Sequence, residues 1–422
     1  MNICVLGLGY IGFPTACLFA NANHKVIGVD INQETIRKIN HGQLPFVETG
    51  LEALFENAYP NMRFKTEVEA ADVFIIAVPT PLDKEMKMAD LCYVRSAAEY
   101  IYPHLRKDNL VVLESTVPPG TCAKLIVPVL KNSGLKTGEF FVAHCPERAI
   151  PGNTIHEMVH NDRIIGGINK RSTALAHSVY SCFVKGKIHL TNTVTAEFVK
   201  LMENTFRDIN IALANEFAQI AEECGTNVWD AIELANKHPR VNVLKPGPGV
   251  GGHCIAIDPW FLTENTTRCR IVSLAREINE GMPNHVLQCV KRLVARIKNP
   301  VITVFGVAYK GGVDDTRETP ALKFLKLAEN EGYTVKVYDP YVKEFEYEIL
   351  GLEEAVKGSD CIVLITDHPE FKAVEPEKIS ALMNTNNVVD TRNMLDTKRW
   401  KEAGFKVKVL GGGEYRVQSQ FQ

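Results

Sequence analysis

The chain has 422 residues, 45% of them hydrophobic, and its 47 basic and 50 acidic residues leave a formal net charge of −3. This length suggests about three domains of ordinary size. The nearly balanced charge gives no electrostatic reason to expect nucleic acid or an anionic membrane as a partner, although it is compatible with a local cationic site for an acidic ligand.

No apolar run approaches the ~18 residues of a membrane span, and the N-terminus "MNICVLGLGYIG" lacks the charged region and cleavage site of a signal peptide. The 11 cysteines form no CxxC pair, which is typical of reduced thiols rather than of a disulfide framework. The 12 histidines show no HxH spacing, and no cysteine cluster accompanies them. We therefore expect a cytoplasmic protein with no metal site.

The first half of the chain alternates short apolar runs with stretches of helical period, which predicts βαβ units and a parallel sheet. The expected strands are "NICVLG", "KVIGVD", "DVFIIAVP", "NLVVLEST", "FFVAHCPE" and "RIIGG". Functional residues of such sheets lie at the carboxyl ends of strands. In this sequence those ends carry Gly7, Asp30, Thr80, Thr116 and Glu147.

From about Thr195 the pattern changes to "TAEFVKLMENTFRDINIALANEFAQIAEECG", with apolar residues at three- and four-residue steps. This predicts one long helix that ends at Gly225 and offers a dimer face. After about Asn299 the alternation returns in "VITVFGVAYK", "TVKVYDP", "DCIVLITD", "NVVDTRN" and "KVKVLGGG". The predicted fold is α/β, with two Rossmann-like doubly wound parallel-sheet domains joined by a long central helix and a small helical domain. We expect the boundaries 1–194, 195–298 and 299–422.

The motif Gly7-x-Gly9-x-x-Gly12 follows the first expected strand and precedes a helical run. In such a turn the glycines permit a tight bend and the close approach of a pyrophosphate, which the helix N-terminus then faces. Asp30 ends the next strand, where a carboxylate accepts hydrogen bonds from ribose hydroxyls and repels a 2′-phosphate. The expected cofactor is therefore NAD, in the domain 1–194. The expected cofactor-binding residues are Gly7, Gly9, Tyr10, Ile11, Gly12, Asp30, Thr80 and Thr116.

The stretch "GPGVGGHCIAIDP", residues 247–259, places Cys254 and Asp258 beside several glycines. Lys200 and Asn204 are four residues apart on the expected long helix and therefore share one face. Taken singly, such a pair is usually part of a solvated face, and a cysteine is usually a small buried hydrophobe. The combination of these residues makes a ligand-binding role worth testing.

Together these motifs resemble the nucleotide-sugar 6-dehydrogenases, the UDP-glucose dehydrogenase superfamily. The resemblance covers essentially the whole chain and rests, in order, on "GLGYIG", "VPTP", "ESTVPPGT", "CPER", "KLMENTFRDINIALANE", "GPGVGGHCIAIDP" and "DDTRETPA". It implies oxidation of the C6 alcohol of a UDP-sugar to a carboxylate, with two NAD⁺ consumed per product. It also implies that a cysteine holds C6 as a thiohemiacetal and then as a thioester.

The same resemblance assigns roles to individual residues. Cys254 matches the nucleophile, and Lys200, with Asn204 beside it, matches the groups that stabilise an oxyanion. Asp258 and Thr116 match residues that orient or activate water. Glu147 matches one carboxylate of the active-site loop. The UDP-glucose enzymes have a second glutamate four residues later, where this chain has Pro151, so the group that accepts the first proton stays open.

The diphosphate of a UDP-sugar needs cations and bare backbone. The resemblance implies that the stretch 247–252 wraps the nucleotide, that Arg240 reaches the substrate of a neighbouring subunit, and that the domain 299–422 binds the UDP-sugar. The expected substrate-binding residues are Glu147, Arg148, Lys200, Asn204, Arg240, Gly249, Gly251, Lys310 and Arg392. A homodimer or a dimer-based oligomer follows from the role of Arg240.

Three alternatives remain open. The segment "ANKHPRVNVLKPGPGVGGHCIAIDPWFL", with Ala256 in place of proline, is most similar to the branch that acts on UDP-N-acetylmannosamine, but UDP-N-acetylglucosamine or UDP-glucose is the alternative substrate. A two-electron hydroxyacid dehydrogenase would share the first domain and the long helix without needing Cys254. A non-catalytic protein that binds NAD and a UDP-sugar for regulation is the alternative from another class.

Overall fold

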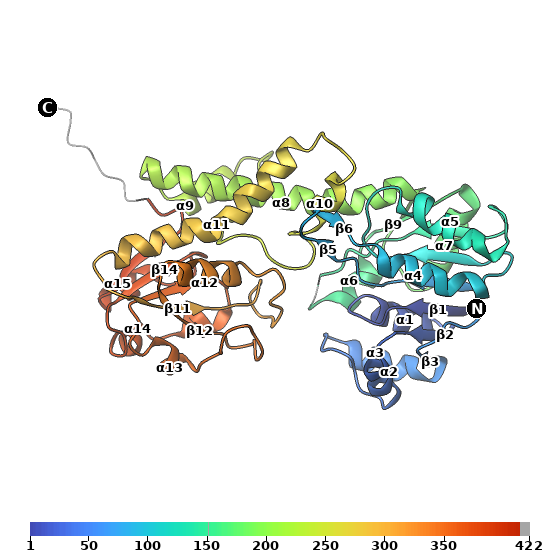
Figure 1. The fold of residues 1–422 in the computed structure, drawn as a ribbon, viewed down its shortest axis with the longest axis horizontal. Helices are drawn as coiled ribbons and strands as arrows, with labels where there is room; N and C mark the ends of the chain where they lie inside the picture. The colour runs from blue at the N-terminus through green and yellow to red at the C-terminus, as the bar shows by residue number, and fades with distance from the viewer. Residues whose placement is uncertain (151, 414–422) are drawn as a thin grey trace. The chain divides into compact units, whose positions relative to one another are not determined.

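The computed structural model describes residues 1–150 and 152–413 of the chain. These residues form two compact units (Figure 1). The first unit comprises 1–203 and 260–265, and the second comprises 204–259 and the described residues from 266 onward. Each unit is built on its own sheet.

The sheet of the first unit has eight strands in the order β10-β9-β8-β7-β4-β1-β2-β3. From β3 to β8 this is the Rossmann order, and the order reverses between β1 and β4, where such folds bind ligands. The strands are β1 (Asn2–Leu6), β2 (Lys25–Val29), β3 (Met62–Lys65), β4 (Val73–Ile76), β7 (Leu110–Leu113), β8 (Phe141–His144), β9 (Arg163–Gly167) and β10 (Ile188–Asn192). A small hairpin, β5 (Leu82–Asp83) and β6 (Met88–Ala89), stands apart from this sheet.

The edge of this sheet departs from the sequence expectation. The segment "RIIGG" forms β9, which pairs antiparallel with β8, and β10 pairs parallel with β9. The connection 145–162, which contains α6 (Thr154–His160), is longer than the dozen residues that a parallel crossover needs, so its length does not set the direction of β9. The direction is instead a matter of which tertiary partners β9 pairs with. The expectation of a uniformly parallel sheet is therefore wrong at this edge, and β3 and β10 were not predicted.

Helices cover both faces of the first sheet. One core cluster joins the sheet to α1 (Gly12–Asn21), α3 (Leu51–Ala58) and α7 (Lys170–Tyr180). The other joins it to α4 (Cys92–Ile101) and to a π-helical turn (Cys122–Ile126) that continues into α5 (Val127–Leu130). A further helix, α2 (Gln33–Asn40), follows β2. Because every central strand is buried on both faces, its sequence is a continuous apolar run rather than an alternating one.

The long helix is present as α8 (Thr193–Cys224). Gly225 follows it with φ of 71°, the left-handed conformation that ends helices, so the predicted stop is confirmed. Among the described residues, no helix is both long enough and apolar enough to cross a membrane.

The second unit contains five parallel strands in the order β12-β11-β13-β14-β15. This is the other common doubly wound order, with its reversal between β11 and β13. The strands are β11 (Val301–Phe305), β12 (Thr334–Tyr338), β13 (Cys361–Leu364), β14 (Asn387–Asp390) and β15 (Lys406–Val409). All five coincide with predicted strands, so the predicted fold class, with two doubly wound sheets and a long helix, is confirmed.

Helices also cover both faces of this second sheet. α11 (Arg270–Val294) and α12 (Pro320–Asn330) pack on one face, and α15 (Thr397–Glu402) packs on the other through Trp400. The remaining helices are α9 (Val228–Ala235), α10 (Asp258–Thr263), α13 (Leu352–Val356) and α14 (Pro376–Ser380). Within this unit α11 is joined to α8 by a buried ion pair, in which Arg276 Nη1 lies 2.7 Å from Asp208 Oδ1.

Candidate active site

The turn between β1 and α1 has the backbone that a dinucleotide loop requires. Gly7 has φ of 90°, and a Cβ there would lie 2.5 Å from the carbonyl oxygen of Ala77. A Cβ at Gly12 would lie 1.9 Å from the carbonyl oxygen of Gly7. At Gly9, by contrast, an added Cβ meets no atom of the described residues within 4 Å, so this glycine faces open space. Gly7 and Gly12 are thus needed by the fold, and Gly9 leaves room for a ligand.

Two further features of this turn suit a dinucleotide. The N-cap of α1 is Ile11, whose side chain cannot accept a hydrogen bond, so a phosphate oxygen can meet the Gly12 amide at the start of the helix. Asp30 follows β2, and its Oδ2 accepts a hydrogen bond from the amide of Leu8 at 2.9 Å. Its Oδ1 accepts from the amide of Asn32 at 2.9 Å. Each oxygen keeps a second lone pair for a ribose hydroxyl.

The other expected cofactor-binding residues belong to the same edge of the first sheet. Thr80 follows β4 and Thr116 follows β7, which are neighbouring strands on one side of the order reversal. Tyr10 is exposed, and its ring centroid lies 4.3 Å from that of Phe46. The residues of this edge therefore fit NAD, as the glycine spacing predicts.

Cys254 lies in the second unit, in a turn that leads into α10. Its carbonyl oxygen accepts hydrogen bonds from the amides of Ile257 at 3.1 Å and Asp258 at 2.9 Å. Cys254 is exposed, whereas Asp258 is buried. The turn therefore leaves the cysteine exposed and buries the aspartate that follows it by four residues.

The Asp258 carboxylate is bonded to α8. Asn204 Nδ2 donates a hydrogen bond to Asp258 Oδ2 at 2.5 Å. On the other side of the same amide, Asn204 Oδ1 accepts a hydrogen bond from the guanidinium of Arg207. Because a guanidinium only donates, Arg207 fixes which way the Asn204 amide points. Sequence analysis selected Asn204 and Asp258 but missed Arg207, although the three-residue spacing on one helix was a visible signal.

Lys200 lies one helical turn before Asn204 and is 9% exposed. In the same unit, His144 ends β8 and is completely buried. Burial lowers the pKa of His144 to about 3, and the nearby charge of Lys200 adds to the effect. The imidazole therefore stays neutral at physiological pH and adds no second cation beside Lys200. Sequence analysis missed His144, whose position at a strand end was the available signal.

Glu147 follows β8, and its carboxylate faces the interior of the first unit. Its Oε1 accepts hydrogen bonds from the amides of Arg148 at 2.6 Å and Ala149 at 2.9 Å. Its Oε2 accepts from Arg163 Nη2 at 2.5 Å. The carboxylate thus closes a turn of its own chain and is paired with a buried cation that sequence analysis did not select.

Arg148 is held in the first unit as well. Its Nη1 lies 2.8 Å from Glu203 Oε1, and its other terminal nitrogen donates to the carbonyl oxygen of Asp162. Pro151, where the sequence departs from the UDP-glucose enzymes, lies outside the described residues.

The glycine-rich segment 247–252 lies against the segment that follows β11, within the second unit. Gly249 and Gly252 have φ of 127° and 83°, which favour glycine. A Cβ at Gly251 or at Gly252 would lie 2.9 Å from atoms of the Tyr309 side chain. The contact requires bare backbone at these positions. Tyr309 was not selected by sequence analysis, although it precedes the selected Lys310.

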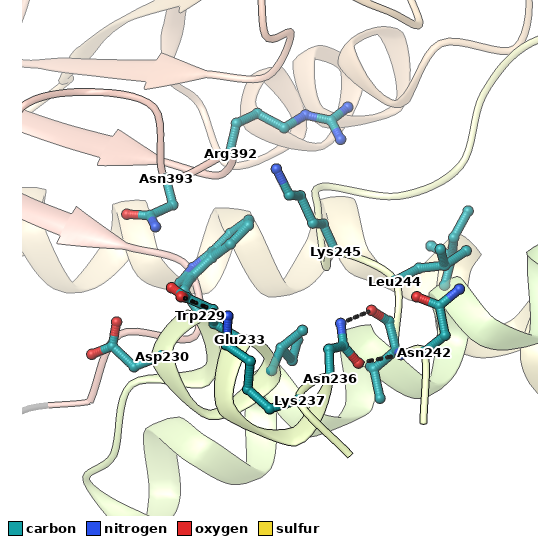
Figure 2. Close-up of a pocket in the computed structure, with 13 residues that line it drawn as sticks. Trp229, Asp230, Glu233, Asn236, Lys237, Asn242, Leu244, Lys245, Arg392 and Asn393 are labelled. Carbon is teal, nitrogen blue, oxygen red and sulfur yellow. Dashed lines mark hydrogen bonds and ion pairs between the residues drawn. The ribbon is translucent and has the colours of Figure 1, made fainter. Parts of the chain in front are cut away.

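A pocket of about 840 Å³ adjoins this segment (Figure 2). It is formed by α9, the segment 242–245 and the turn after β14. The side chains of Lys245 and Arg392 lie at the same end of it. A Cβ at Gly247 would lie 2.7 Å from Arg392 Nη1, and Arg392 Nε donates to the carbonyl oxygen of Ile365 at 2.8 Å. The lining residues are Ile211, Trp229, Asp230, Ile232, Glu233, Asn236, Lys237, Asn242, Val243, Leu244, Lys245, Arg392 and Asn393.

These pocket residues suit a nucleotide diphosphate. Two cations and nearby glycine backbone can bind phosphate, and the indole of Trp229 offers an apolar surface to a base.

The expected cation Lys310 is exposed in the loop after β11, and Arg240 is exposed in the loop after α9. His253 is half-buried, and burial lowers its pKa, as does the charge of Arg317.

One cluster in the second unit has the composition of a metal site. Glu222, His285 and Cys289 bring one ligand atom each to within 4.8 Å of one another. However, Glu222 Oε1 lies 3.0 Å from Lys408 Nζ and accepts from the amide of Gly411 at 2.8 Å. These contacts already supply the carboxylate with a cation and an amide donor. The cluster joins α8, α11 and β15 without needing a metal ion.

Comparison with known proteins assigns most of the chain to one family. Residues 1–184 match the NAD binding domain of the UDP-glucose/GDP-mannose dehydrogenase family. Residues 194–281 match the central domain of that family, and residues 303–397 match its UDP binding domain. The chain therefore belongs to the UDP-glucose/GDP-mannose dehydrogenase family, whose members are NAD-dependent oxidoreductases of nucleotide sugars.

Individual relatives cover nearly the full length of the chain. It is 50% identical to a UDP-N-acetyl-D-mannosamine dehydrogenase of Methanococcus maripaludis over 98% of both chains. It is 43% identical to an NDP-N-acetyl-D-galactosaminuronic acid dehydrogenase of Ralstonia nicotianae, over 94% of this chain and 97% of the other. A solved UDP-D-ManNAc dehydrogenase of Pyrococcus horikoshii is 45% identical, with a TM-score of 0.93, over 98% of this chain and 100% of the other.

Proposed function

We propose that this enzyme oxidises the C6 alcohol of UDP-N-acetylmannosamine to UDP-N-acetylmannosaminuronate, through a covalent intermediate on Cys254. The observation that carries the proposal is the turn at 254–258. It presents an exposed cysteine and buries Asp258 against Asn204 at 2.5 Å. An oxidation that stopped at the aldehyde would need neither the nucleophile nor a group to activate water.

NAD⁺, held by the glycine turn and Asp30, would supply the hydride acceptor for each of the two oxidations. After the first oxidation, the Cys254 thiolate adds to the aldehyde carbon and forms the thiohemiacetal. Loss of the second hydride leaves a thioester, and water then cleaves the C–S bond, releasing the carboxylate and restoring the thiol. The ammonium of Lys200 and the amide of Asn204 stabilise the oxyanions formed at C6. Asp258 and Thr116 orient the water that attacks the thioester.

The nucleotide binds to the second unit in this proposal. The diphosphate meets the backbone of 247–252, Lys310 and Arg392, and the base enters the pocket lined by Trp229 and Lys245. Relatives named UDP-N-acetyl-D-mannosamine dehydrogenase support mannosamine as the sugar. Ala256 within "CIAIDP" supports the same choice over the glucosamine branch.

A substrate panel tests this proposal. UDP-N-acetylmannosamine, UDP-N-acetylglucosamine, UDP-N-acetylgalactosamine, UDP-glucose and UDP-galactose are each incubated with NAD⁺, and NADH is followed by its absorbance. We expect the mannosamine derivative to give the highest kcat/KM and two NADH per sugar consumed. One NADH per sugar would contradict the four-electron reaction, and none with any sugar would favour the non-catalytic alternative.

We further propose that the enzyme is a homodimer that buries one face of α8. Apolar side chains recur along this face at helical spacing and are exposed: Val194, Phe198, Met202, Phe206, Leu213, Phe217 and Ile220. Soluble monomers rarely expose so long an apolar stripe. A helix face of this kind can pair with its own copy about a two-fold axis, because the patch is self-complementary. Such a dimer would also give Arg240 a neighbouring substrate to reach.

Placing a charge in this stripe tests the dimer. Phe206 is 64% exposed, so Phe206→Glu adds a carboxylate without disturbing the core. We expect sedimentation velocity to show the parent as a dimer and this variant as a monomer. Val47→Glu, at an exposed position outside α8, is the matched control and should remain dimeric. A monomeric parent would contradict the proposal.

A further inference from the structure

The first unit contains a buried chain of polar side chains to which the proposed reaction assigns no role, although the family resemblance places one end of it in the active-site loop. Its members are Thr15 on α1, Glu114 after β7, Glu147 after β8, Arg163 at the start of β9 and Tyr180 at the end of α7. Each of these residues or their side chains is at most 8% exposed. Burying charges is costly unless each has partners, so the contacts of each group indicate what it does.

At one end of the chain, Glu147 has a complete set of donors. Two amides of its own loop, those of Arg148 and Ala149, donate to Oε1, and Arg163 Nη2 donates to Oε2 at 2.5 Å. A carboxylate that closes a backbone turn and pairs with a guanidinium is held in place by these bonds. To take a proton from a substrate, Glu147 would have to break this arrangement.

Arg163 contacts three different segments. Besides Glu147, its Nη2 donates to the carbonyl oxygen of Met158 at 3.3 Å, and its Nη1 donates to Cys145 Sγ at 3.6 Å. Its guanidinium carbon lies 5.1 Å from the centroid of the Tyr180 ring. The guanidinium is thus fixed on several sides, so it can set the position of the loop that Glu147 closes.

At the other end, Glu114 connects Arg163 to the helix of the cofactor turn. Arg163 Nη1 lies 3.8 Å from Glu114 Oε1, which also accepts a hydrogen bond from Tyr180 at 2.7 Å. Glu114 Oε2 accepts a hydrogen bond from Thr15 Oγ1 at 3.0 Å. Thr15 is on the first turn of α1, three residues after Gly12 of the glycine motif. One continuous chain of contacts therefore runs from α1 to the loop 147–150.

We propose that Arg163 and Glu114 are positioning residues, which hold Glu147 as the closure of the loop 147–150 and keep that loop in register with α1. Glu147 is then itself a positioning residue and not the group that accepts the first proton. Only the expected effect of these residues on substrate binding rests on the proposed function. The geometry of the loop 147–150 can be tested without any substrate.

Amide hydrogen exchange of the substrate-free protein tests the geometry. In Arg163→Gln we expect the amides of Arg148 and Ala149 to exchange at least about tenfold faster, since one charge-assisted hydrogen bond is lost. Arg163→Lys, which keeps the charge, should be intermediate. Arg171→Gln removes an exposed guanidinium of the same unit, 2.9 Å from Asp108, and should match the parent. Parental exchange in Arg163→Gln would overturn the proposal.

The isosteric variant Glu114→Gln tests the same proposal if Arg163→Gln does not fold. Burial raises the pKa of Glu114 to about 7, against the opposing charge of Arg163. The other groups that face Glu114 are Tyr180, Thr15, Glu147 and Cys145. Once Glu114 ionises, it competes with Glu147 for Arg163. Protection of the 148 and 149 amides, corrected for intrinsic exchange, should fall at least about threefold from pH 6 to pH 8 in the parent. Glu114→Gln should abolish this fall, and an equal fall in both proteins would overturn the proposal.

The kinetics of UDP-sugar oxidation distinguish a positioning role of Glu147 from a role as the group that accepts the proton. In Glu147→Gln we expect the KM for the UDP-sugar to rise about tenfold while the acidic limb of the kcat profile stays where it is in the parent. Loss of that limb would identify Glu147 as the base and overturn its assignment as a positioning residue. If no UDP-sugar is oxidised, the proposed function fails, while the exchange results still decide the loop geometry.

Discussion

Replacing Cys254 by alanine is expected to lower kcat for oxidation of the UDP-sugar by at least about 10³-fold, because the second oxidation and the hydrolysis both proceed through the cysteine sulfur. The substitution keeps the backbone bonds of the turn, in which the Cys254 carbonyl oxygen accepts from the amides of Ile257 and Asp258. Binding of NAD⁺ should be unchanged, because its residues lie in the first unit. NADH absorbance gives the rate, and calorimetry gives the affinity for NAD⁺.

A matched control separates the nucleophile from a general effect of removing a thiol. Cys224 is another exposed cysteine, at the end of α8, and Cys224→Ala should retain parental turnover. Cys254→Ser should accumulate an adduct that mass spectrometry can detect, because an alkoxide leaves less readily than a thiolate. Parental kcat in Cys254→Ala would eliminate the thioester mechanism and return the enzyme to the two-electron alternative.

Much of this fold could be read from local patterns. The strands of the second unit, the glycine turn before α1 and the stop of α8 at Gly225 depend on nearest neighbours, which periodicity and glycine spacing report directly. The direction of β9 is different, because "RIIGG" is equally compatible with a parallel or an antiparallel partner. Its direction is set by its tertiary pairing, antiparallel with β8 and parallel with β10, which strand composition does not contain.

The candidate site likewise contains residues that the sequence predicted and partners that only the structure shows. Asn204 and Asp258 were found because motif spacing carries them, but their hydrogen bond joins positions 54 residues apart and becomes visible only in the fold. Arg163 looked like an ordinary polar start of a strand, and its burial beside Glu147 could not be inferred from that pattern. Sequence motifs therefore selected the groups proposed to touch substrate, whereas the partners that orient these groups required three-dimensional contacts.

The largest expected effect on stability lies at the ion pair between α8 and α11. Asp208 is completely buried and Arg276 is 1% exposed, with 2.7 Å between Oδ1 and Nη1. Asn279 Nδ2 also donates to Asp208 Oδ1 at 2.8 Å. Asp208→Ala leaves the guanidinium buried with only Glu280, at 3.2 Å, as a charged partner. We expect the free energy of unfolding of the second unit to fall by about 3–5 kcal/mol.

Urea unfolding followed by tryptophan fluorescence measures this change, since Trp229 and Trp400 both belong to the second unit. Removing both charges, in Asp208→Ala with Arg276→Met, should recover part of the loss, because the damage comes from a stranded cation rather than from a missing attraction. Glu402→Ala breaks an exposed pair, 3.9 Å from Lys398, and should leave the midpoint unchanged. A double variant less stable than Asp208→Ala would show instead that the guanidinium stabilises this unit through its packing and its remaining hydrogen bonds.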